Sequence, residues 1–169
     1  FDIFVYLERG KQMLDQGNTA FVLISAALVL LMTPGLAFFY GGMVKAKSVV
    51  SMMMLSFGSL GIIGVLWVIY GYAIAFSNGG SKTFIGIDGV FGIDTSFIGL
   101  DAQLKDALNP TGAYPSMAFV AFQATFAIIT VALISGAIAD RAKFGAWMVF
   151  AGVWATLVYF PVANWVFNF

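Results

Sequence analysis

Long uncharged stretches, separated by short polar breaks, dominate the pattern of the chain. The clearest stretch runs without a charge from residue 113 to residue 139 and ends at the charged cluster 140–143. An α-helix rises about 1.5 Å per residue, so roughly 20 apolar residues cross a bilayer core of about 30 Å. Residues 113–139 are therefore long enough to form a tilted membrane-spanning helix.

Three further stretches have the same character. The first is uncharged over residues 18–44, and Asn18 or Thr19 can act as its N-cap. The second covers about 48–76, and the last runs from 144 to about 164. The pattern predicts an all-α, polytopic membrane bundle with four spanning helices.

Glycine and proline positions refine this picture. Gly61, Gly64 and Gly71 fall on one face of the second helix, where small residues let helix backbones approach closely. Pro34 lies inside the first helix and removes one backbone hydrogen bond, which predicts a kink there. Both features indicate helix packing and specify no chemistry.

The breaks between the helices suggest one transmembrane domain over 1–169 and an orientation. The turns at 43–47 and 140–143 are short and carry two basic residues each, beside the helix ends. The other side holds as many basic residues, but these are spread over long segments among acidic ones. Because basic residues near helix ends favour the cytoplasm, we expect both turns there. The loop 77–112 and both termini then lie on the extracytoplasmic side.

Composition narrows the class of protein. The chain is 61% hydrophobic and 9% charged, with a mean hydropathy of +0.96, whereas a soluble domain carries about 25% charged residues. This indicates an integral membrane protein in contact with the lipid bilayer. Cysteine and histidine are absent, which excludes zinc sites of Cys and His and Ser-His-Asp triads within the chain. A net charge of zero gives no nucleic-acid footprint, and we expect no enzyme activity, metal or cofactor.

The third helix carries a stripe at helical spacing that includes Phe122, Phe126, Thr130 and Leu133. Such a stripe can line a narrow hydrophobic path or pack against a neighbouring helix, and the pattern leaves both open. No predicted helix carries an ionisable residue away from its ends, although such residues usually mark proton relays and ion-coupled pumps. Passive conduction, binding and scaffolding remain.

Three runs along the chain have distinctive sequences. Residues 28–42 read LVLLMTPGLAFFYGG, residues 122–130 read FQATFAIIT, and residues 159–163 read YFPVA. In this order they resemble the first helix, the third helix and the end of the fourth helix of the ammonium transporter family (Amt/MEP/Rh). The similarity extends over the whole chain from Thr19.

The resemblance implies a homotrimer of eleven-helix subunits, of which this chain corresponds to the N-terminal part. Each subunit of such a trimer holds its own hydrophobic pore for ammonium or ammonia, with methylammonium as an analogue. The resemblance also implies an outer aromatic recruitment site, a phenylalanine gate below it and a location in the plasma membrane. A PII-type regulatory protein is a possible partner at the cytoplasmic face.

The resemblance assigns roles to individual residues. Phe126 matches a gate phenylalanine that also forms the floor of the recruitment site. Phe167 falls where many members carry a tryptophan, and a phenyl ring attracts cations less strongly than an indole does. Asn164 stands where the motif often has histidine, near the outer end and away from a pore position. The neighbours of Phe126 complete the substrate-binding set and two leucines line the pore: Phe122, Gln123, Leu36 and Leu133.

The leading hypothesis is an ammonium transporter or channel. Because the chain has no histidine, the paired pore histidines of the family are not among these residues. One alternative is an ammonium sensor or regulatory module that binds without appreciable flux. A second alternative is a structural bundle fragment in which the aromatic stripe is vestigial.

Overall fold

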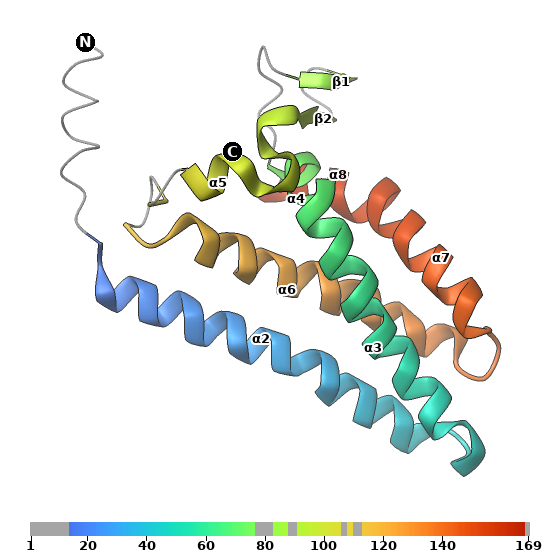
Figure 1. Cartoon of the computed structure of the whole chain (residues 1–169). Coiled ribbons are helices and arrows are strands. Elements are labelled where there is room, and N and C mark those ends of the chain that lie inside the picture. The colour runs from blue at the N-terminus through green and yellow to red at the C-terminus, as the bar shows by residue number, and fades with distance from the viewer. Residues whose placement is uncertain (1–13, 77–82, 88–90, 106–107, 110–112, 168–169) are drawn as a thin grey trace, which may run out of the picture.

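The computed structural model describes residues 14–76, 83–87, 91–105, 108–109 and 113–167 (Figure 1). Within these residues, four helices are long and apolar enough to cross a membrane: Gln16–Met43, Ala46–Ala75, Ser116–Ile138 and Phe144–Phe167. The predicted four-helix membrane bundle is confirmed, and its limits match the pattern to within a few residues.

The first span is a single helix, α2 (Gln16–Met43), which begins earlier than predicted. The carboxylate of Asp15 accepts hydrogen bonds from the backbone N–H groups of Gly17, at 2.8 Å, and Asn18, at 3.1 Å. Asp15 is therefore the N-cap, and the prediction that Asn18 or Thr19 takes this role is wrong. A carboxylate makes stronger charge-assisted bonds to the free N–H groups than an amide or hydroxyl does. The helix also runs through Pro34 without a break (Figure 1).

The second and fourth spans each contain one π-helical turn. The second span consists of η1 (Ala46–Ser48), α3 (Val49–Leu66), the π-turn η2 (Trp67–Gly71) and α4 (Tyr72–Ala75). The fourth consists of α7 (Phe144–Trp154), the π-turn η5 (Ala155–Tyr159) and α8 (Phe160–Phe167). The third is α6 (Ser116–Ile134), which tightens into the 3₁₀ turn η4 (Ser135–Ile138). A π-turn places an extra residue in one turn and is frequent at functional sites.

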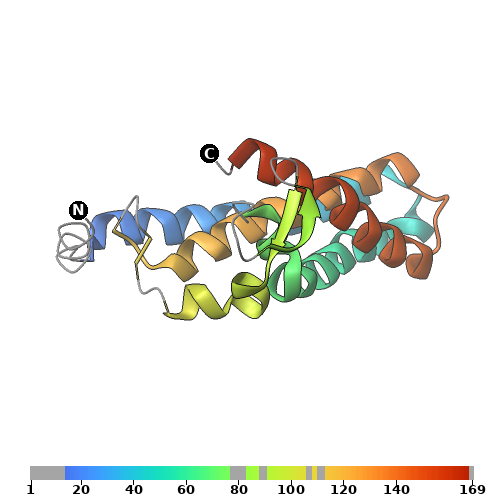
Figure 2. The same ribbon diagram turned by 90° about the horizontal axis from the view of Figure 1, so that it is seen from above.

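The connection between the second and third spans is partly described. It contains the antiparallel hairpin of β1 (Thr83–Ile87) and β2 (Phe91–Asp94), followed by η3 (Thr95–Leu100) and α5 (Asp101–Lys105). Strand β2 contacts α4 and α8, so the hairpin lies over that end of the bundle (Figure 2).

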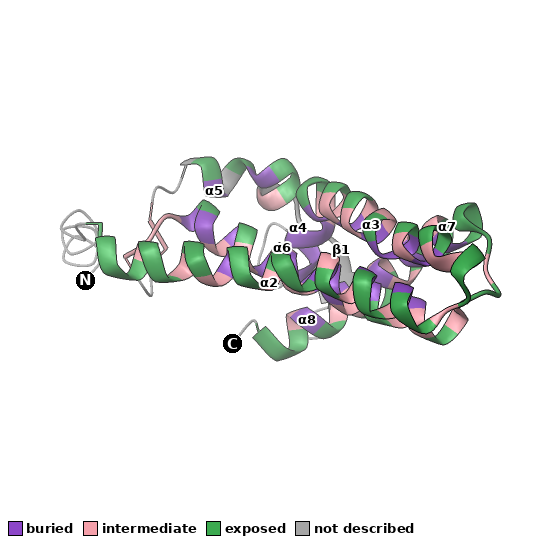
Figure 3. Ribbon diagram, turned by 90° about the horizontal axis from the view of Figure 1, so that it is seen from below, coloured by how far each residue is buried: buried purple, intermediate pink, exposed green. Residues whose placement is uncertain are grey.

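The helices pack in a defined order. Helix α2 packs on α3 and α6, α3 packs on α6 and α7, and α4 packs on α8. Helices α2 and α6 run in the same direction, because the Asp15 N–H donates to the Ala113 carbonyl at one end and the Tyr40 hydroxyl donates to the Leu133 carbonyl at the other. The buried core lies mainly between α3, α6 and α7–α8, whereas most of α2 is exposed (Figure 3).

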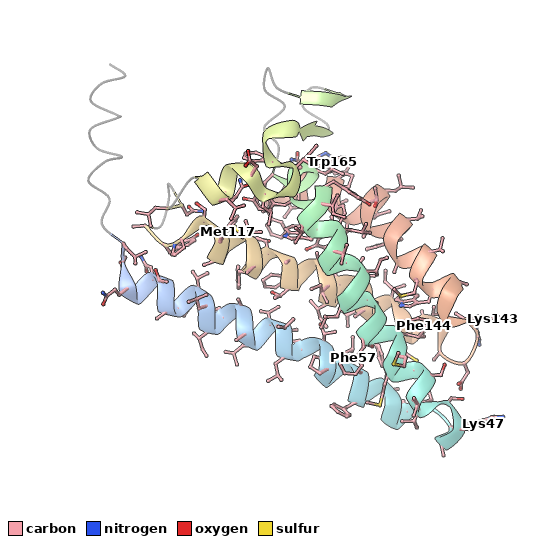
Figure 4. All side chains as sticks on the ribbon, in the orientation of Figure 1. Lys47, Phe57, Met117, Lys143, Phe144 and Trp165 are labelled. Carbon is pink, nitrogen blue, oxygen red and sulfur yellow. The ribbon has the colours of Figure 1, made fainter. Side chains whose placement is uncertain are left out.

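Both basic turns lie at one end of the bundle. Lys47 and Lys143 mark that end, and Met117 and Trp165 lie toward the opposite end (Figure 4). This arrangement agrees with a common side for the two turns. That this side faces the cytoplasm stays a prediction.

The predicted glycine face of the second span is only partly a packing face. A Cβ at Gly71 would lie 2.7 Å from the Phe160 ring, so Gly71 is a point of close approach. A Cβ at Gly61 or Gly64 would meet no heavy atom within 4 Å. The pattern therefore identifies one contact glycine of three, because helical spacing alone does not say which stretch of a face has a neighbour.

Candidate functional site

A cavity of about 300 Å³ lies between the third and fourth spans. Helix α6 supplies two of the lining side chains, and the fourth span supplies the rest from α7, η5 and α8. The lining residues are Phe126, Thr130, Trp154, Val158, Tyr159, Val162, Ala163, Val166 and Phe167. Two substrate-binding residues suggested by the resemblance, Phe126 and Phe167, therefore lie on one cavity although they are far apart in the sequence.

The cavity wall is almost entirely hydrocarbon and aromatic surface. Thr130 and Tyr159 contribute hydroxyl groups and Trp154 contributes an indole, and no charged residue is among the lining side chains. Among the described residues, no group of three or more Asp, Glu, His and Cys side chains could hold a metal ion. Ring faces attract a small cation, whereas an apolar wall disfavours an unpaired charge. The arrangement suits a weakly held small cation at its aromatic edge.

The other two predicted substrate-binding residues lie beside this cavity, outside its lining. The ring of Phe122 meets that of Phe126 edge to face, with centroids 5.1 Å apart and an angle of 85° between the ring planes. This geometry is favourable for aromatic pairs and restrains the Phe126 ring. Gln123 is buried within the bundle, with 9% of its surface exposed.

The predicted pore-lining leucines lie at another level of the bundle. Leu133 follows Phe126 by two helical turns, which corresponds to about 10 Å along the helix axis. Its side chain is half exposed, and its carbonyl accepts the hydrogen bond from the Tyr40 hydroxyl at 3.0 Å. Leu36 lies on α2, one turn before Tyr40, and is partly buried. The structure thus separates an aromatic cavity from a leucine level nearer the basic turns.

Comparison with known proteins identifies the family that has this architecture. The profile of the Ammonium Transporter Family matches residues 20–169. The chain belongs to this family. The resemblance seen in the three sequence runs is thereby confirmed over nearly the whole chain.

Individual members of the family are closely similar. An ammonium transporter of Mycobacterium tuberculosis (strain H37Rv) is 55% identical over 162 residues, which cover 92% of this chain and 34% of that protein. An ammonium transporter of Bacillus subtilis is 46% identical over 155 residues, covering 92% of this chain and 36% of the relative. The chain thus spans about a third of the length of these curated relatives.

Solved structures of the family share the fold. The crystal structure of Saccharomyces cerevisiae Mep2 superposes with a TM-score of 0.77 at 29% identity, covering 94% of this chain and 34% of that one. Candida albicans Mep2 gives a TM-score of 0.74 at 28% identity, over 92% of this chain and 32% of that chain.

Sequence reasoning missed most of the cavity wall of this family member. Trp154, Val158, Val162 and Val166 recur at steps of four along the fourth span, and all line the cavity. This four-residue spacing can be seen in the sequence. A step of four overshoots a full α-helical turn by about 40°, however, so four such positions do not share one face of a regular helix. The π-turn η5 offsets this drift, and periodicity does not reveal it.

Proposed function

We propose that the protein moves ammonium or ammonia across the membrane, with Phe126 and Phe167 forming an aromatic recruitment site and Phe126 acting as a gate. Membership of the Ammonium Transporter Family supports transport of this substrate in general. The observation that carries the proposal is the shared cavity, since Phe126 of α6 and Phe167 of α8 both line it.

The positive charge of ammonium decides how the cavity can bind it. A desolvated cation over an aromatic face gains about 2 kcal/mol, which is enough for recruitment and too little for tight retention. Beyond the two phenyl rings, the lining offers valine and alanine surface, the hydroxyls of Thr130 and Tyr159, and the indole of Trp154. The same apolar surface opposes entry of the charged form. The rings therefore favour binding of the charged ammonium ion, and the apolar path favours passage of the neutral ammonia molecule.

The proposal also covers the pore below the gate and the proton that ammonium would lose. We assign Leu36 and Leu133 to the hydrophobic pore below the gate. A proton removed from ammonium needs an acceptor, and the chain contains no histidine. We therefore assign no proton-accepting role to a side chain of this chain, and Gln123 stays a predicted neighbour of the site.

The proposed assembly follows the family resemblance. We propose a homotrimer in the plasma membrane, with the basic turns of Lys47 and Lys143 on the cytoplasmic side. Their common end supports a shared orientation (Figure 4). A PII-type regulatory protein would then meet the protein at this end.

The proposal is tested by methylammonium uptake into proteoliposomes that contain the intact protein. Phe126→Ala removes the ring that lies on the cavity, so we expect the apparent KM to rise roughly five- to thirty-fold, the equivalent of about 1–2 kcal/mol of cation–π attraction. The matched control is Phe21→Ala, which removes a ring that is 72% exposed on α2 and should leave uptake unchanged.

The outcomes separate the hypotheses. Unchanged uptake by the Phe126→Ala variant would remove Phe126 from the site. Saturable methylammonium binding without uptake by the unmodified protein would favour a sensor. Absence of both would favour a structural role.

A further inference from the structure

The fourth span carries a second stripe, at residues 156, 160 and 164, which contacts the second span at successive levels. The Thr156 hydroxyl forms a hydrogen bond of 2.7 Å with the Tyr70 hydroxyl. One turn further, Phe160 is fully buried against Gly71, where a Cβ would lie 2.7 Å from the ring.

The last contact of this stripe is made by Asn164. Its side-chain amide donates to the Ile74 carbonyl at 3.1 Å and to the Ala75 carbonyl at 3.2 Å. These carbonyls belong to the last turn of α4, where no further turn supplies N–H donors. Asn164 therefore caps the second span from the side and fixes α8 beside α4.

The cavity side chains follow the same spacing on an adjacent face of the helix. Tyr159, Ala163 and Phe167 each come three residues after a member of the contact stripe, and all three line the cavity. Because α8 contains only Phe160–Phe167, the bonds of Asn164 fix the same two turns that present Phe167.

The two π-turns meet within this contact. Tyr70 belongs to η2 and Thr156 to η5, and their hydroxyls join the turns directly. Thr156 also donates to the Gly152 carbonyl at 2.8 Å, which anchors the hydroxyl on its own helix. The rotation of α8 about its axis, and with it the direction of Phe167, thus depends on polar contacts outside the cavity.

We propose that Asn164, supported by Thr156, is a positioning residue that sets the affinity for ammonium by holding the Phe167 ring at the cavity. This inference rests on the proposed function. Neither Asn164 nor Thr156 lines the cavity, so both act through Phe167 and not on the substrate. The bundle itself is held by other contacts, including the bonds from Trp67 to the Val120 carbonyl and from Trp147 to the Leu55 carbonyl.

A double-mutant cycle on methylammonium uptake by the intact protein tests this role. Asn164→Leu keeps a similar volume and removes both donors, so we expect the apparent KM to rise about three- to ten-fold, the effect of losing an ordinary hydrogen bond. The maximal rate should stay within about two-fold, because the pore below the rings is unchanged. Asn164→His restores a ring N–H donor and should recover most of the affinity.

The decisive comparison repeats Asn164→Leu in a Phe167→Ala background. If Asn164 acts through the ring, its effect on KM there should shrink to less than about two-fold, because the two residues are coupled. An equal fold-change in both backgrounds, or no change in either, would overturn the inference. Leu157→Ala, at a 70% exposed position next to Thr156, is the matched control and should behave as the unmodified protein.

Two further outcomes keep the tests separate. If Phe167→Ala alone leaves KM unchanged, the proposed recruitment role of Phe167 fails and the positioning role fails with it. If Phe167→Ala raises KM and Asn164→Leu does not, only the positioning role fails. Should Asn164→Leu prevent folding, Thr156→Val takes its place in the cycle, with the same expected coupling and a smaller rise of about two- to three-fold.

Discussion

Helices α2 and α6 lie side by side and have almost the same hydropathy, yet they bury very different shares of their surface. Their most apolar windows have mean hydropathies of 2.3 and 2.2, and 11% of the α2 window is buried against 44% of the α6 window (Figure 3). Apolar character alone therefore does not tell the buried face of a span from its exposed face.

The size of the side chains distinguishes the buried face of α2 from its exposed face. The buried positions of α2 all carry small side chains and recur on one face: Ala26, Thr33, Ala37 and Gly41. Its large side chains, such as Phe21, Leu31 and Phe38, are more than half exposed. Helix α6 buries larger residues, including Ile128 and Val131. Because lipid offers no hydrophobic drive to pair helices, close approach of backbones decides which face of α2 packs.

The largest expected effect comes from comparing a glycine of η4 that packs against α2 with a glycine on the exposed face of α2. A Cβ at Gly136 would lie 2.6 Å from the Tyr40 ring, so Gly136→Ala must displace this ring or move η4 away from α2. We expect a loss of about 1–3 kcal/mol in the free energy of unfolding. A Cβ at Gly35 meets no heavy atom within 4 Å, and Gly35→Ala should be neutral or stabilising by up to about 1 kcal/mol.

Reversible unfolding of the intact protein in detergent measures both variants. Equal destabilisation by the two substitutions would break the contrast, because it would show that a further helix packs on the exposed face of α2.

A smaller effect is expected from Tyr40→Phe, which tests the polar contact between the same helices. The substitution removes the hydroxyl that donates to the Leu133 carbonyl and keeps the ring against Gly136. We expect a loss of about 1 kcal/mol, the net value of one hydrogen bond. The same unfolding experiment measures it, and a loss as large as that of Gly136→Ala would show that the hydroxyl, and not the close approach, joins the helices.

The smallest change is expected from Thr33→Val on the packed face of α2. Thr33 is fully buried, and its hydroxyl oxygen has no hydrogen-bond partner in the structure. Replacing the hydroxyl by a methyl group of the same shape should leave stability unchanged or raise it by up to about 1 kcal/mol. A loss above about 1 kcal/mol in thermal unfolding would indicate that the hydroxyl has a partner in the assembled protein.

The sequence predicted the spans well, because uncharged length is what a bilayer selects. The second span, predicted at about 48–76, lies at Ala46–Ala75, and the fourth, predicted from 144 to about 164, ends at Phe167. The resemblance added Phe126 and Phe167, which lie on one cavity. Their role in binding stays a prediction.

The remaining features depend on contacts between helices, which a single pattern does not contain. Asp15 lies just outside the uncharged stretch that predicts the first span, yet its carboxylate makes it the N-cap of that helix. The sequence shows only the motif position of Asn164, because its hydrogen-bond partners lie at the end of another span. The cavity positions of Trp154 and Val158 depend on a π-turn, and no residue type specifies that turn from the sequence.

The π-turn η5 shows that the number of residues in the fourth span affects which way its side chains face. In genetic terms, Ala155–Tyr159 behaves as an ordinary helical turn with one inserted codon. Because the turn takes up its extra residue locally, losing that residue would leave the rest of the span facing nearly the same way. Deleting a residue from the regular helix between η5 and Asn164 would instead rotate all later positions by about 100°. Phe167 would leave the cavity and Asn164 would leave its carbonyls in one step, although neither had been altered. Selection therefore acts on the number of residues in this segment as well as on their identity.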